Sequence, residues 1–75
     1  MNIYHYIHIR PEPDYEEKTE QLAPQPVEED EILLDLFDGR AFIARLTSNS
    51  GTVEWEPVPP YVERILFNKF IHKIY

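Results

Sequence analysis

Two small groups of residues have side chains that could do chemistry. His5 and His8 lie three residues apart in a segment that alternates like a strand, so they face opposite ways and cannot share a metal ion. Asp35 and Asp38 are neighbouring carboxylates, but a turn explains Asp38 and a cross-strand ion pair with Arg40 explains Asp35. No nucleophile, base and orienting group can be assembled from these residues. We therefore expect no catalytic residue, no metal site, no cofactor and no enzymatic activity.

The strongest pattern in the chain is the distribution of its charge. The 75 residues carry a net charge of −7, and residues 11–31 hold nine acidic residues against the single base Lys18, which is −8 for that segment alone. We call residues 11–31 the acidic segment. It has four prolines, no glycine and few apolar side chains. This composition predicts an extended or disordered strap, and a single helical turn within residues 14–22 is the alternative.

The N-terminal residues 1–10 alternate in the manner of a strand. Ile3, His5, Ile7 and Ile9 share one face, which we expect to pack on the core. The other face carries Tyr4, Tyr6, His8 and Arg10. It is half apolar, so we expect it either to be covered by another part of the chain or to form an interface. Pro11 and Pro13 end the strand, because proline has no backbone donor.

The residues 32–46 predict a β-hairpin. Two apolar runs flank Asp38-Gly39, a dipeptide typical of a two-residue type I′ turn. That turn pairs Leu36 with Ala41, Leu34 with Ile43, and Ile32 with Arg45. A helix over residues 26–37, with acidic residues in its first turn and Gly39 as its C-cap, is the competing interpretation.

The remaining residues predict a turn, a short strand and a helix. Residues 47–51 are typical of a turn, and Thr52 to Val58 form a strand that nearby prolines place at a sheet edge. Residues 61–75 form a helix with a broad apolar stripe that includes Tyr61, Ile65, Leu66 and Phe70. The prediction is a single α+β domain over residues 1–75. Its antiparallel sheet has three to four strands in the order β-strap-βββ-α, with the helix on one face.

Composition narrows the function classes. There is no apolar run long enough to span a membrane and no secretory signal, and the absence of cysteine suits a reducing compartment, so we expect a cytoplasmic protein. The basic residues are scattered and the net charge is negative. Phosphate would therefore repel the chain, and we expect no direct contact with nucleic acid and no membrane binding.

The concentrated negative charge favours a protein partner. We predict a small acidic binding or inhibitory module that docks on a larger, basic, nucleic-acid-handling protein. Carboxylates spaced like phosphates would make it a nucleic-acid mimic, as suits an inhibitor from a phage or mobile element. The expected charged contacts are Asp14, Glu16, Glu17, Glu20, Glu28, Glu29, Asp30 and Glu31, and the expected apolar anchors are Tyr4, Tyr6, Phe42 and Trp55. The alternative is a small structural subunit or homodimer that uses its aromatic sheet face, with the acidic segment a solvated connector.

Overall fold

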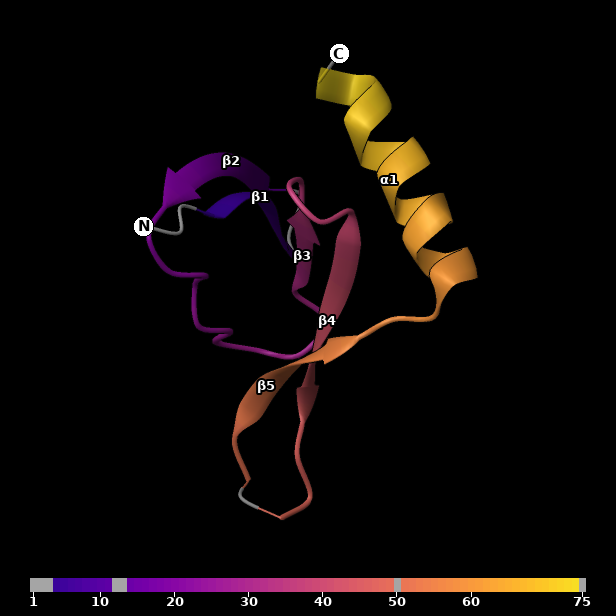
Figure 1. The fold of residues 1–75 in the computed structure, drawn as a ribbon. Helices are drawn as coiled ribbons and strands as arrows, with labels where there is room; N and C mark the ends of the chain where they lie inside the picture. Colours follow the sequence, from indigo (N-terminus) through magenta and orange to yellow (C-terminus); the bar gives the residue numbers. More distant parts are fainter. Residues whose placement is uncertain (1–3, 12–13, 50, 75) are drawn as a thin grey trace.

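The computed structural model describes residues 4–11, 14–49 and 51–74, which form one antiparallel sheet and one helix (Figure 1). The elements are β1 (Tyr4–Arg10), β2 (Asp14–Glu20), β3 (Ile32–Asp35), β4 (Arg40–Leu46), β5 (Val53–Pro57) and α1 (Pro60–Ile74). The strand order is β2-β1-β3-β4-β5. The α+β class is confirmed, and the described residues contain one strand more than the upper end of the prediction.

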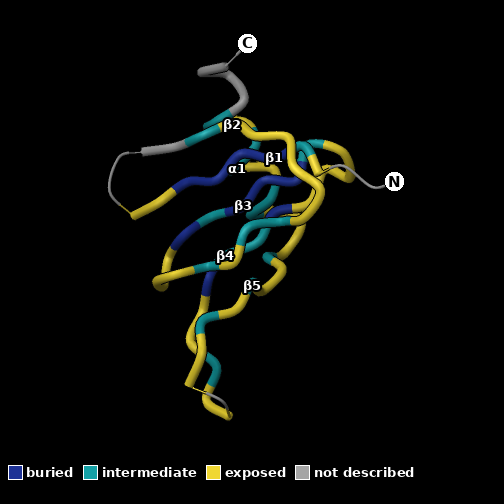
Figure 2. Tube along the Cα trace, turned by 90° about the vertical axis from the view of Figure 1, so that its left-hand side faces the viewer, coloured by how far each residue is buried: buried dark blue, intermediate teal, exposed yellow. Residues whose placement is uncertain are grey.

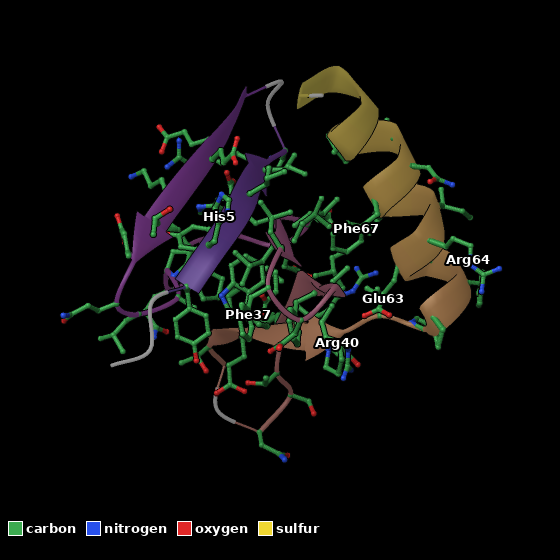
Figure 3. The ribbon with its side chains drawn as sticks, turned by 45° about the horizontal axis from the view of Figure 1, so that its top comes forward. His5, Phe37, Arg40, Glu63, Arg64 and Phe67 are labelled. Carbon is green, nitrogen blue, oxygen red and sulfur yellow. The ribbon has the colours of Figure 1, made fainter. Side chains whose placement is uncertain are left out.

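The helix α1 covers one face of the sheet and closes the apolar core. Ile7, Leu34 and Ala41 are fully buried in this core, and Phe67 and Phe70 of α1 pack against them. Figure 3 shows Phe67 pointing from the helix toward the sheet. Tyr61 and Ile65, which we expected in the apolar stripe, are instead exposed. The contacting stripe is therefore narrower than predicted, as expected for a single helix on a small sheet.

Glu63 in the first turn of α1 attaches the helix to β4. Its Oε2 accepts the backbone N–H of Ala41 at 2.8 Å and the Nε–H of Arg40 at 3.1 Å. The carboxylate also lies near the helix N-terminus, where negative charge is favourable. This side chain therefore ties the N-terminal end of α1 to the start of β4.

In the described part of the acidic segment from residue 14 onward, the first seven residues are a strand. Residues 14–20 form β2, which pairs with the whole of β1, from Arg10 opposite Asp14 to Tyr4 opposite Glu20. Of the predicted extended or disordered strap, the extended form is therefore confirmed for residues 14–20, and the alternative helical turn is wrong there. The physical reason lies on β1, because His5 contacts Glu17 at 2.7 Å and Tyr6 donates to Glu20 at 3.1 Å.

The second half of the acidic segment, residues 21–31, is a loop that covers the sheet face opposite α1. We call it the covering loop. Both β2 and β3 run antiparallel to β1, which lies between them, so the loop must return along the length of β1 to reach β3. The stretch of β1 that the loop must pass, from Tyr4 opposite Glu20 to Ile9 opposite Ile32, is about 17 Å long. A loop of 11 residues spans it easily. With a helix on one face and this loop on the other, Tyr6 to Ile9 are all buried (Figure 2).

The β3–β4 hairpin is confirmed, and the helix proposed for residues 26–37 is wrong. Its register differs from the prediction by two residues, because Leu34 pairs with Ala41 and Asp35 with Arg40. The connecting loop therefore has four residues rather than two. Gly39 adopts a φ of +72°, as the turn requires. The longer loop forms because the Asp35 carboxylate accepts hydrogen bonds from the two backbone N–H groups at its start.

The strand β5 lies at the edge of the sheet, as its prolines predict, with Pro57 at its end. The turn before it contains Gly51 with a φ of +67°. The helix α1 begins at Pro60, which suits the first helical position because it lacks an N–H. Within the described part of the chain, no helix combines the length and the apolar character needed to cross a membrane.

Candidate aromatic pocket

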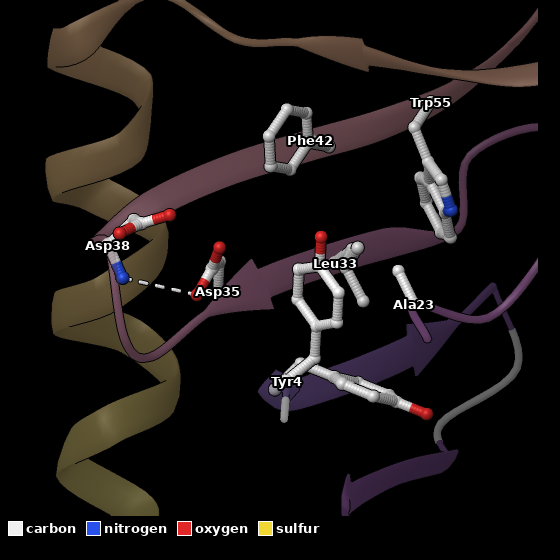
Figure 4. Close-up of a pocket in the computed structure, with 8 residues that line it drawn as sticks. Tyr4, Ala23, Leu33, Asp35, Asp38, Phe42 and Trp55 are labelled. Atoms are coloured by element: carbon white, nitrogen blue, oxygen red, sulfur yellow. Dashed lines mark hydrogen bonds between the residues drawn. The ribbon is translucent and has the colours of Figure 1, made fainter. Parts of the chain in front are cut away.

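The four aromatic residues predicted as anchors line one pocket on the sheet face opposite α1 (Figure 4). Its volume is about 310 Å³. The lining residues are Tyr4, Tyr6, Ala23, Leu33, Asp35, Asp38, Phe42 and Trp55. We call this the aromatic pocket. The sequence indicated the aromatic anchors, but not that they share one site.

Strand register explains why these side chains meet. Tyr6 of β1 lies opposite Asp35 of β3, and Leu33, two residues earlier, lies opposite Phe42 of β4. Residues two apart in a strand face the same way, so Tyr4 joins this face as well. Four neighbouring strands, β1, β3, β4 and β5, therefore each contribute side chains to the aromatic pocket.

The covering loop makes one wall of the pocket. The indole Nε1–H of Trp55 donates to the backbone carbonyl of Pro24 at 2.7 Å, and Ala23 lines the pocket beside it. The rings of Trp55 and His8 meet edge to face, with centroids 5.8 Å apart and an interplanar angle of 79°. Tyr6 is 2% exposed and Tyr4 is 38% exposed. Tyr6 therefore forms the floor, while Tyr4 stays accessible to a ligand.

The charged groups of the pocket are both carboxylates. Asp35 is 8% exposed, and its Oδ1 accepts the backbone N–H of Phe37 at 2.9 Å and of Asp38 at 3.1 Å. Across residues 4–11, 14–49 and 51–74 its Oδ2 accepts no hydrogen bond, and Figure 4 shows this oxygen turned toward the side where Phe42 lies. The ion pair predicted between Asp35 and Arg40 is wrong, because Glu63 takes the Arg40 guanidinium instead.

The hydroxyl of Tyr6 is a neutral donor. It donates to Glu20 Oε2 at 3.1 Å. Burial raises the pKa of Tyr6 to about 12, and the hydrogen bond and negative charge of Glu20, with the charge of Glu16, add to this effect. Tyr6 therefore carries no negative charge at neutral pH, which leaves Asp35 and Asp38 as the anionic groups of the lining.

Glu31, predicted as a partner contact, is a buried structural residue. It is 1% exposed, and its Oε2 accepts the backbone N–H groups of Val27 at 2.6 Å and Glu28 at 2.7 Å. Its Oε1 contacts Nε2 of His8, which is also buried. Burial raises the pKa of the Glu31 carboxyl, but the two backbone hydrogen bonds and His8 outweigh burial and hold the pKa below its usual value. This carboxylate therefore fastens the covering loop to β1.

The remaining acidic residues do not form one row. Their backbones divide between β2, which holds Asp14, Glu16, Glu17 and Glu20, and the covering loop, which holds Glu28, Glu29 and Asp30. Several already have partners within the chain, among them Glu17 with His5 at 2.7 Å, Glu16 with Lys18 at 3.1 Å and Asp30 with Arg45 at 3.3 Å. The hydrogen bond and charge of Lys18 lower the pKa of Glu16. A continuous ladder of free carboxylates is therefore not the arrangement that the acidic segment adopts.

Residues 23, 33, 35 and 38 belong to the pocket and were not expected there. For Asp35 the sequence did carry a local signal. An aspartate side chain often accepts hydrogen bonds from the backbone N–H groups two and three residues later in a turn, as Asp35 does here. Ala23 and Leu33 had none, because their place depends on pairing between distant strands. No cluster of three or more metal-binding side chains is found among the described residues.

Comparison with models of protein families, with curated proteins and with solved structures finds no match. The functional argument therefore depends on the pocket itself.

Proposed function

We propose that this protein is a small non-enzymatic binding module that docks on a basic protein through the aromatic pocket. The observation that carries the proposal is the composition of that pocket. Four aromatic residues and two carboxylates line it, and among the described residues no lysine or arginine does. Aromatic residues dominate the binding energy of protein interfaces, and unbalanced carboxylates favour a positively charged partner.

The charge of the whole chain supports the same kind of partner. A net charge of −7 on 75 residues attracts a basic protein over a distance of several ångströms and raises the association rate at low salt. Glu28 and Glu29 are exposed on the covering loop and make no ion pair with described residues. They supply long-range attraction, while the pocket supplies the close contacts.

In this role the module competes with nucleic acid for a basic surface of its partner, and so acts as an inhibitor. A homodimer through the same face is the alternative function. A two-fold symmetric interface would place Asp35 and Asp38 of one copy near their equivalents in the other, between chains of equal negative charge. Electrostatic repulsion opposes that arrangement and favours a basic partner.

A matched pair of tyrosine variants tests the proposal. Tyr4 lines the pocket and is 38% exposed, whereas Tyr61 on α1 is 66% exposed and lies outside the pocket lining. Proteins from the host lysate are captured on wild type, Tyr4→Ala and Tyr61→Ala, and the captured partner is purified. We expect Tyr4→Ala to weaken its affinity about tenfold or more, which is the effect of losing an aromatic anchor, and Tyr61→Ala to leave it unchanged.

Salt dependence and oligomeric state complete the test. Affinity for the partner should fall between about 50 and 200 mM salt, since the attraction is between exposed charges. A partner bound equally by both tyrosine variants, or bound with no dependence on salt, contradicts the proposal. A concentration-dependent dimer seen by light scattering, abolished by Tyr4→Ala, would favour the homodimer instead.

A further inference from the structure

We infer that the aromatic pocket receives one arginine side chain of the partner, with its guanidinium group against Asp35 and Asp38. This inference rests on the proposed function and specifies its chemistry. It follows from one carboxylate oxygen that no described residue engages, from the aromatic surfaces around that oxygen, and from a lining whose described residues include no lysine or arginine.

Asp35 provides the polar end of the site. Nine-tenths of its surface is buried, and the turn amides engage only Oδ1. Oδ2 accepts no hydrogen bond within residues 4–11, 14–49 and 51–74. Among the described residues no fully buried side-chain nitrogen or oxygen lacks a hydrogen-bond partner, so Oδ2 keeps contact with solvent and is open to a ligand with N–H groups. Asp38 lies at the exposed rim, so a donor with several N–H groups can reach both carboxylates.

The aromatic side chains provide the rest of the site. The rings of Tyr4, Phe42 and Trp55 surround the hollow next to Asp35 (Figure 4). Aromatic faces attract cations, and a guanidinium ion stacks on them because it is planar and weakly hydrated. The apolar stem of the same side chain would lie along Leu33 and Ala23, which also line the pocket.

Other ligand classes fit this lining less well. A phosphate, a nucleotide or an acidic peptide would meet two carboxylates and no basic group. A lysine ammonium keeps its hydration more strongly and cannot stack on a ring, so it gains less from the aromatic surfaces. A purely apolar side chain would leave Asp35 Oδ2 without a donor. Arginine satisfies both the carboxylate and the aromatic requirements.

The chain contains its own reporter for this site. Trp55 is the only tryptophan and it lines the pocket, so intrinsic fluorescence reports occupancy without a label. The probes are three capped pentapeptides, Gly-Ser-X-Ser-Gly, in which X is arginine, lysine or citrulline. Citrulline has nearly the shape of arginine but no charge. Each peptide is titrated into the full chain at low salt.

We expect a saturable change in Trp55 emission with the arginine peptide. Its affinity should exceed that of the citrulline peptide by about tenfold or more, since charge-assisted hydrogen bonds are the stronger class. Asp38→Asn should weaken arginine binding by about two- to fivefold, the range for a pair at an exposed rim. The matched control is Glu54→Gln, which removes the same charge from an exposed residue outside the lining and should change nothing.

Three results would overturn the inference. The first is equal binding of the arginine and citrulline peptides, and the second is equal or tighter binding of the lysine peptide. The third is an equal loss of arginine binding in Asp38→Asn and Glu54→Gln, which would show attraction by net charge alone. If the purified partner binds in a Tyr4-dependent way while the arginine peptide does not, the inference fails and the proposed function stands. If the partner is insensitive to Tyr4→Ala, the proposed function fails.

Discussion

The buried carboxylate of Glu31 leads to the most direct prediction about this fold. In the Glu31→Ala variant, the N–H groups of Val27 and Glu28 lose their acceptor, and the buried imidazole of His8 loses its contact. The middle of the covering loop would then keep the bond between Trp55 Nε1 and the carbonyl of Pro24, while its end keeps the two backbone hydrogen bonds between residues 30–31 and Ala44. The variant therefore tests whether the acidic segment stabilises the fold or only follows it.

The expected loss can be worked out from these contacts. The two loop N–H groups are part-buried, so each hydrogen bond contributes about 1 kcal/mol after rehydration in the variant. His8 is 8% exposed, and leaving it without a partner costs about 1–3 kcal/mol. The sum is about 3–5 kcal/mol. A chain of 75 residues has a total stability of about 4–11 kcal/mol, so the variant should be only marginally folded.

Urea unfolding of wild type and variant, followed by far-ultraviolet circular dichroism and by Trp55 fluorescence, measures this loss. At an m-value of about 1 kcal/mol/M, the unfolding midpoint should fall by about 3 M or more. The control is Glu29→Ala, an exposed neighbour, which should stay within about 0.5 kcal/mol of wild type. A loss below about 1 kcal/mol in Glu31→Ala would refute the argument that this carboxylate fastens the loop.

Three further predictions concern pH and the attachment of the helix. The pKa of Glu31 in the folded state lies below 4.5, so its carboxylate contributes to the free energy of unfolding above that pH and loses this contribution as it is protonated. In acid titrations, the stability difference between wild type and Glu31→Gln should therefore shrink as the pH falls below about 4.5. Because the folded pKa of Tyr6 is about 12 against 10.0 for the free side chain, the folded state keeps a proton that the unfolded state loses. Wild type should therefore lose stability between pH 10 and 12 relative to Tyr6→Phe in urea titrations. Glu63→Ala leaves the Ala41 N–H without an acceptor and should cost about 1–3 kcal/mol by thermal unfolding, whereas the exposed Arg64→Ala should cost under 0.5 kcal/mol.

The elements predicted correctly are those with a local cause. The Asp38-Gly39 pair between apolar runs indicated the β3–β4 hairpin, and the position of Pro60 before an apolar stripe indicated α1. The hairpin register was off by two residues because a side chain, Asp35, competes for the turn amides. Propensity rules for two-residue turns do not include that competition.

The strand β2 was missed because its cause is not local. Its sequence DYEEKTE is rich in like charge and has little of the apolar alternation that marks a strand. Its acids find partners on β1, where His5 contacts Glu17 and Tyr6 donates to Glu20, and this pairing cannot be read from residues 14–20 alone. The burial of Glu31 has the same kind of origin, because its partner His8 is 23 residues away.

The candidate site was predictable in its residue types but not in its geometry. Aromatic anchors were expected, and Tyr4, Tyr6, Phe42 and Trp55 all line the pocket. Their meeting depends on the pairing of β1 with β3, which lie about 20 residues apart in sequence with β2 between them. The acidic contacts were predicted as one group, and the strand order divides them between a sheet edge and a loop.

The covering loop connects the stability of the fold to the shape of the pocket. Ala23 and the Pro24 carbonyl form the wall against Trp55, and a few residues later Glu31 fastens the same loop to His8. Since the His8 ring also lies against Trp55, the carboxylate and the indole hold the loop from two sides of one small cluster. Loosening Glu31 should therefore open the pocket as well as weaken the fold. The acidic character of the segment is thus partly structural, and Glu28 and Glu29, which are exposed and make no ion pair with described residues, are the acids to which the proposed function assigns the attraction of a partner.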